Sequence, residues 1–329
     1  MWNSDTPALP WYQSPIRVLY DRIINSFYEN SPLTVSRLDA LVEEGLIRRG
    51  IFFNPEQSAL KTPKVDLISK RIEVHEPFMS FLWCLCYNFI FLNEATQKLA
   101  VEDQKVIQIN NLTTTGLNEM NYLIGWAFSL RDTYSEWPEF MPNPAGTNDK
   151  VRMANALVTE ALKFLLYHEV AHLANNHVAY LSLVEKPAED LTLEELFELK
   201  VLEAEADNYA FDMLVGPELN DATYNQAMGC VVAQLSALFI ISETRKLKQL
   251  RHPDIDTRLF NLMNKIKFED VRYQMNIDQT LNMGLSFFLH IHKVSYLPAD
   301  PENITWHETF EEVLRYLYDQ IDKAKDDDE

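Results

Sequence analysis

The pentapeptide His168-Glu169-Val170-Ala171-His172 has the residue types and spacing of a catalytic metal site. On a helix, residues four apart lie on one face, so two imidazoles at this spacing can bind one metal ion. Glu169, next to them, can polarise a metal-bound water without binding the metal. The alternative is a pair of core histidines that hydrogen-bond to carbonyl groups. We expect a site for Zn2+.

The residues around this motif favour a helix. No Pro or Gly occurs from Val151 to Leu181, and Asn148 or Asp149 offers an N-cap. At helical spacing, several apolar residues share one face with both histidines: Ala154, Leu157, Ala161, Phe164 and Leu165. His168 and His172 are therefore expected to face the interior.

The third zinc ligand has to come from outside the pentapeptide. The metzincin pattern would place Gly and His where this chain has Asn175 and Val178, so that pattern fails. His177 comes one residue too early and is expected to lie off the metal face.

A second helix, expected from Leu193 to Val215, offers the missing ligand. Glu203 falls among apolar residues on this helix, and a buried carboxylate is costly unless it is paired or metal-bound. Glu205 falls on the solvent face. Asp207, one turn after Glu203, can accept a hydrogen bond from the second ring nitrogen of a ligand histidine. Glu203 is the predicted third ligand, with a salt bridge to Arg or Lys as the alternative.

With these residues the chain resembles the gluzincin zinc peptidases, which combine HExxH on one helix with a Glu ligand on a following helix. The segment HEVAHLANNH looks like the first site helix of the HtpX and CAAX-processing peptidases, and Glu203 to Asp207 reads E-x-x-A-D as in those families. Arg251 to Leu259 (RHPDIDTRL) looks like their H-P-x-x-x-x-R element. By this resemblance, His252 is a second catalytic residue that stabilises the tetrahedral oxyanion, with Tyr209 as another candidate.

Those membrane families carry transmembrane helices, and a soluble relative fits this chain better. LYHEVAHLANNH followed by EAEADNYAFDML is similar to the Lit-type phage-exclusion peptidases, and the ImmA/IrrE-type peptidases are another soluble relative. The Lit-type resemblance implies cleavage of a particular host protein, a translation factor, in phage defence. It also implies an enzyme that stays inactive until infection, and hence a regulatory activator. A role in a stress response is the other expectation.

Composition restricts partners and compartment. The 329 residues carry a net charge of −20, which disfavours nucleic-acid phosphates and anionic membranes. The apolar run from Phe78 to Leu92 is shorter than the roughly 20 residues of a membrane span. Cys84, Cys86 and Cys230 cannot all pair, which suits the reducing cytoplasm. We expect a cytoplasmic protein whose partner is a protein or peptide substrate.

The expected architecture is mostly α (α+β), a helical zincin-type metallopeptidase core with a small β-sheet. We divide the chain into a helical N-terminal extension (1–60) and a zinc metallopeptidase domain (61–329), whose motif core spans 150–265. Lys70 to Val74 and Val106 to Ile109 are the strand candidates. One of them is expected at the edge of the sheet, where gluzincins bind the extended substrate backbone.

Chemistry follows from the predicted ligands. Zinc held by His168, His172 and Glu203 keeps a fourth position for water and lowers the pKa of that water. Glu169 is then the general base that passes the water's proton to the leaving amine. The function predicted is that of a zinc-dependent endopeptidase. The alternative is a non-catalytic zinc-binding sensor or regulatory interaction protein.

Overall fold

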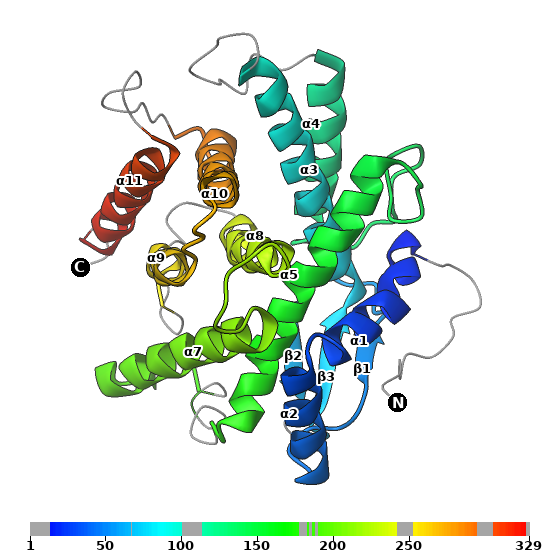
Figure 1. Cartoon of the computed structure of the whole chain (residues 1–329), viewed down its shortest axis with the longest axis vertical. Helices are drawn as coiled ribbons and strands as arrows, with labels where there is room; N and C mark the ends of the chain where they lie inside the picture. Colours follow the sequence, from blue (N-terminus) through cyan, green and yellow to red (C-terminus); the bar gives the residue numbers. More distant parts are fainter. Residues whose placement is uncertain are drawn as a thin grey trace.

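The computed structural model describes residues 14–66, 68–100, 114–177, 190–241, 253–294 and 305–326, together with Leu183, Lys186 and Pro187. Helices dominate this part of the chain, and three short strands form one sheet (Figure 1). In chain order the elements are η1 (Pro15–Leu19), α1 (Tyr20–Tyr28), α2 (Pro32–Glu43), β1 (Ile51–Asn54), β2 (Lys64–Asp66), β3 (Arg71–His75), α3 (Glu76–Ala100), α4 (Thr114–Ser129), α5 (Asp149–Ala174), α7 (Leu193–Leu214), α8 (Tyr224–Ile240), α9 (Ile255–Lys265), α10 (Val271–Ile291) and α11 (Trp306–Asp326). The predicted mostly α (α+β) class is confirmed.

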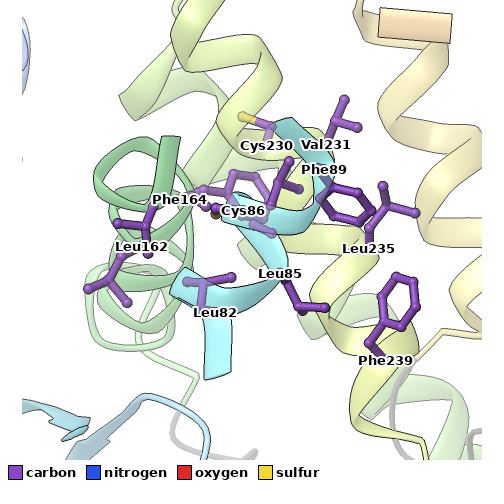
Figure 2. Close-up of a cluster of buried hydrophobic side chains, with 14 of the residues drawn as sticks. Leu82, Leu85, Cys86, Phe89, Leu162, Phe164, Cys230, Val231, Leu235 and Phe239 are labelled. Carbon is purple, nitrogen blue, oxygen red and sulfur yellow. The ribbon is translucent and has the colours of Figure 1, made fainter. Parts of the chain in front are cut away.

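Helix α5 runs through the middle of the molecule and packs against α3, α7 and α8 (Figure 1). Asn148 caps it, because its side chain accepts the Val151 N–H at 2.9 Å. Figure 2 shows the core between α3, α5 and α8, where Cys86, Phe164 and Phe239 lie among aliphatic side chains. This burial makes α5 the scaffold of the molecule.

A close approach of α8 to α5 depends on Gly229. A Cβ atom at this position would lie 2.5 Å from Glu160 Cβ and 2.7 Å from the Glu160 carbonyl carbon. Both distances are shorter than real Cβ contacts, and one involves backbone that cannot swing away. Glycine therefore sets the spacing between the two helices.

Helix α7 is held against α5 by a polar junction centred on Asn30. The Asn30 amide donates to the carbonyls of Met213 and Leu214 at the end of α7, both at 2.9 Å. Its oxygen accepts from Lys163 Nζ of α5 at 2.9 Å and from Gln226 of α8 at 3.0 Å. The loop between α1 and α2 thus fixes the end of α7 against α5. Helix α7 carries Glu203, and α5 carries the HExxH motif.

The sheet has the order β1-β3-β2, with β1 parallel and β2 antiparallel to β3. The strand predicted at Lys70 to Val74 is confirmed as β3, but it is the middle strand and not an edge. The nearest edge to α5 is β2, whose Val65 pairs with Ile72. The other candidate, Val106 to Ile109, lies outside the described residues.

The N-terminal segment contributes to the same core. Tyr20 of α1 stacks on Phe53 of β1 with ring centroids 3.8 Å apart. β1 lies within residues 1–60 and pairs with β3, which lies beyond them. The division at residue 60 stays a prediction. Within the described residues, no helix has both the length and the apolar character that a membrane span needs.

Candidate active site

The two histidines of the HExxH motif lie on the buried face of α5. His168 is 7% exposed and His172 is 5% exposed. Their ring centroids are 5.1 Å apart and the ring planes differ by 81°. One helical turn separates them, so both rings reach the same space between α5 and α7.

Glu203 of α7 completes a group of three ligand-type side chains. A capping box fixes the start of α7, because Thr192 and Glu195 bond to each other's backbone N–H. Eight residues after Glu195, the Glu203 carboxylate is 1% exposed. Its Oε2 lies 3.2 Å from His168 Nε2 and its Oε1 lies 3.7 Å from His172 Nε2. The structure therefore brings together the three predicted ligands.

These three residues fit a zinc ion in both spacing and chemistry. Their ligand atoms all lie within 4.8 Å of one another. Tetrahedral zinc with bonds of about 2.1 Å places its ligand atoms about 3.4 Å apart, which the separations of 3.2 and 3.7 Å bracket. Burial alone lowers the pKa of His168, but the Asp207 and Glu203 carboxylates raise it to about 10. The site thus stabilises a positive charge, as a site for a cation must.

The second ring nitrogen of His168 contacts a partly buried charged pair. His168 Nδ1 lies 2.9 Å from Asp207 Oδ1. Arg258 of α9 donates to both oxygens of Asp207, from Nε at 2.8 Å and from Nη2 at 2.7 Å. Burial alone would raise the pKa of Asp207, but the Arg258 guanidinium and His168 hold it well below its usual range. Asp207 thus lies where the sequence placed it, and Arg258, to which the sequence gave no role, anchors it.

The second ring nitrogen of His172 contacts another histidine. His172 Nδ1 lies 2.9 Å from His177 Nδ1, and His177 is 5% exposed. His177 Nε2 lies 3.4 Å from Glu205 Oε2, whose side chain is 54% exposed. The pKa of His177 is lowered because the effect of burial outweighs the raising effect of the Glu205 carboxylate.

His177 is not a member of the group of three ligand-type side chains, in line with its expected place off the metal face. It reaches the second ring nitrogen of His172 because α5 ends before it. The helix ends at Ala174, and Asn176 has a left-handed φ of 53°. This turn folds the chain back, so the ring of His177 reaches that of His172. The signal in the sequence was the pair Asn175-Asn176, since Asn is one of the few residues that adopt the left-handed region.

Glu169 lies beside the ligands and contacts the edge of the sheet. Its Oε2 accepts the backbone N–H of Val65 in β2 at 3.1 Å. Burial raises the pKa of Glu169 to about 7, against the lowering effect of His168. Val65 is a contact that the sequence did not predict, because three residues of strand carry no readable alternation. A carboxylate with this pKa is suited to take up and release a proton near neutral pH.

His252, the predicted oxyanion donor, lies outside the described residues. The next residue, Pro253, lines a small cavity of about 20 Å³ together with Asp207 and Arg258. Tyr209, the other candidate, is partly buried against the main hydrophobic core. Burial raises the pKa of its hydroxyl.

The sequence model of the Peptidase U49 family matches residues 72–277, well over half of the chain. The chain belongs to the Peptidase U49 family. This is the Lit-type peptidase family, so the predicted kinship with a peptidase is confirmed. The matched span contains α5, α7 and Arg258, and it begins after β2. No curated protein and no solved structure matches the chain.

Proposed function

We propose that this Peptidase U49 chain is a zinc-dependent endopeptidase of the gluzincin type, which hydrolyses a peptide bond of a specific protein substrate. The observation that carries the proposal is the buried group of His168, His172 and Glu203. Glu169 lies beside this group, on the same helix as the two histidines. Two imidazoles and one carboxylate are the ligand set of zinc peptidases, in which a further position stays open. When bound, zinc would acidify the attacking water and polarise the scissile carbonyl.

Glu169 is the general base of the proposed reaction. It removes the proton of the attacking water and passes it to the nitrogen of the leaving amine. The N–H of Val65 holds one carboxylate oxygen, which fixes the direction of the other. Burial keeps bulk water from stabilising the charged form, so the raised pKa matches the double role of base and acid.

The substrate backbone is proposed to lie along the edge of β2 that faces away from β3, an edge that pairs with no other strand of the described residues. This strand pairs with β3 on one side, and on its other side the Val65 N–H points to Glu169. An extended peptide added at this edge would pass directly by the general base. We propose His252 as the oxyanion donor, a role supported by the resemblance of Arg251 to Leu259 to the H-P-x-x-x-x-R element within the span that the family model matches.

Glu169→Gln tests this function, because the amide keeps the size of the side chain but cannot accept a proton. We expect unchanged zinc content and a loss of cleavage of about 10²- to 10⁴-fold. The measurement is labelling of new N termini in an extract of phage-infected host cells, which supplies the proposed activator, with zinc counted by elemental mass spectrometry. Equal cleavage by both proteins would contradict the general base. A zinc-loaded wild type that cuts nothing would favour the regulatory zinc-binding alternative, and a wild type without zinc would overturn the metal site.

We propose a role in phage defence, with an activator that releases the peptidase during infection. Membership of the Lit-type family supports this role. The three cysteines of the chain are all free and buried, which suits a cytoplasmic enzyme. Phage should plate less efficiently on cells that make the wild type than on cells that make Glu169→Gln. Equal plating over a broad phage panel would contradict the role.

A further inference from the structure

We infer that His177 is a positioning residue for His172, and that Glu205 holds His177 in turn. The inference rests on the proposed zinc site and adds residues that the ligand set does not include. It starts from the contact between His172 Nδ1 and His177 Nδ1 at 2.9 Å, in which both side chains are at least nine-tenths buried.

The backbone at the end of α5 builds this contact. The N–H of His177 donates to the carbonyl of His172 at 3.0 Å, and the N–H of Asn176 donates to that of Leu173 at 3.1 Å. These two bonds and the left-handed backbone of Asn176 form a Schellman motif. In this motif the residue after the left-handed one packs against the residue five positions earlier, here His177 against His172. Such a contact is usually hydrophobic, and here it joins two imidazoles.

The metal site and Glu205 decide which ring nitrogen carries the proton in His172 and in His177. His172 can bind a metal through Nε2 only if that atom carries no proton, so its proton lies on Nδ1. His172 then donates to His177 Nδ1, which accepts. A neutral His177 carries its proton on Nε2, the atom 3.4 Å from Glu205 Oε2. The acceptor nitrogen of His177 thus holds the tautomer of His172, and the negative charge of Glu205 favours the proton on His177 Nε2.

The same contact fixes the orientation of the His172 ring. A rotation of the His172 ring about the bond to its Cβ would carry Nδ1 away from His177 Nδ1 and break the 2.9 Å contact. A metal ligand whose second nitrogen is bonded in this way loses less freedom when the metal binds. His177 is therefore expected to raise zinc affinity without binding the metal.

Two variants of equal polarity separate this role from a merely structural one. In His177→Asn the amide oxygen can occupy the place of Nδ1 and still accept from His172, whereas in His177→Gln the amide group lies near the place of Nε2. We expect His177→Gln and His177→Ala to weaken zinc binding by about 10- to 100-fold. His177→Asn should stay within a few-fold of the wild type.

The measurement is the dissociation constant for zinc, from competition with a fluorescent chelator, on full chains whose folding is checked by circular dichroism. Two-bond ¹H–¹⁵N spectra of the zinc-loaded proteins should show the His172 proton held on Nδ1 in the wild type and in His177→Asn. Equal zinc affinity in the wild type and all three variants would overturn the inference and leave the zinc site intact. A wild type that binds no zinc would instead overturn the proposed function. If His177→Ala does not fold, equal affinity of the Asn and Gln variants still contradicts the inference.

Discussion

His168 and His172 lie one turn apart on α5, yet their second ring nitrogens meet opposite kinds of support. His168 is held by Asp207 and Arg258, which we call the Asp207 arm. His172 is held by His177 and Glu205, which we call the His177 arm. The Asp207 arm is charged and mostly buried, whereas the His177 arm passes through a second imidazole to a carboxylate that is 54% exposed.

The two arms also differ in the distance they span along the chain. Asp207 is 39 residues from His168 and 51 residues from Arg258, so the Asp207 arm ties α5, α7 and α9 together. His177 is five residues from His172 and depends on a local turn. We therefore expect the Asp207 arm to support both the fold and the site, and the His177 arm to support the site alone.

Loss of Arg258 should have the largest effect on the Asp207 arm. Arg258→Met removes both donors and leaves the Asp207 carboxylate buried, which should lower the free energy of unfolding by about 3–5 kcal/mol. Urea denaturation measures this change. Lys265→Met on the same helix, a partly exposed side chain 3.9 Å from Asp212, is the control and should cost less than about 1 kcal/mol. A smaller loss in the free energy of unfolding for Arg258→Met than for Lys265→Met would refute the structural role of the Asp207 arm.

Asp207→Asn tests how far the charge of the Asp207 arm reaches the metal site. The amide keeps the shape of the side chain but presents no charge to His168 or Arg258. Zinc affinity should fall by about 10- to 100-fold, measured by chelator competition. An unchanged dissociation constant would show that the carboxylate does not act on His168.

The left-handed turn offers a way to change the His177 arm through the backbone. Asn176→Val should lower the free energy of unfolding by about 1–2 kcal/mol, because a branched side chain is strained at a φ of 53°. Zinc affinity should fall with it, since the position of His177 depends on this turn. Asn176→Gly relieves the strain and is the matched variant. Val and Gly variants of equal stability and equal zinc affinity would contradict the account.

Glu205→Gln should have the smallest effect. The side chain is 54% exposed, and its contact with His177 Nε2 is an ion-pair contact at 3.4 Å whose loss water can compensate. Exposed charge contacts contribute at most about 1 kcal/mol, so zinc affinity should change by less than about fivefold. A larger loss than in Asp207→Asn would reverse the order of the two arms.

Helical periodicity was sufficient for much of the site. The inward faces of two uninterrupted helices place His168, His172, Glu203 and Asp207 in one space, as the sequence predicted. Their roles stay proposals. The mostly α class and strand β3 were also readable from local patterns.

The contacts that the sequence did not yield depend on a turn or on distant residues. The contact between His177 and His172 was not predicted, because Asn176 leaves the helix although no Pro or Gly marks its end. β3 was one of two candidates for the edge strand, and its central place was not readable because strand order follows from tertiary pairing. The three residues of β2 give no pattern. The anchoring of Asp207 by Arg258 requires α9 to pack beside α7, which no local signal shows.

The most direct test of the account is a crystal structure of the zinc-loaded protein with diffraction data on both sides of the zinc absorption edge. The account predicts one anomalous peak about 2.0–2.2 Å from His168 Nε2, His172 Nε2 and a Glu203 oxygen. His177 Nδ1 should stay in contact with His172 Nδ1, on the side of the ring away from the metal. A zinc-soaked crystal without a peak at these three residues, or with zinc bound to His177, would contradict it.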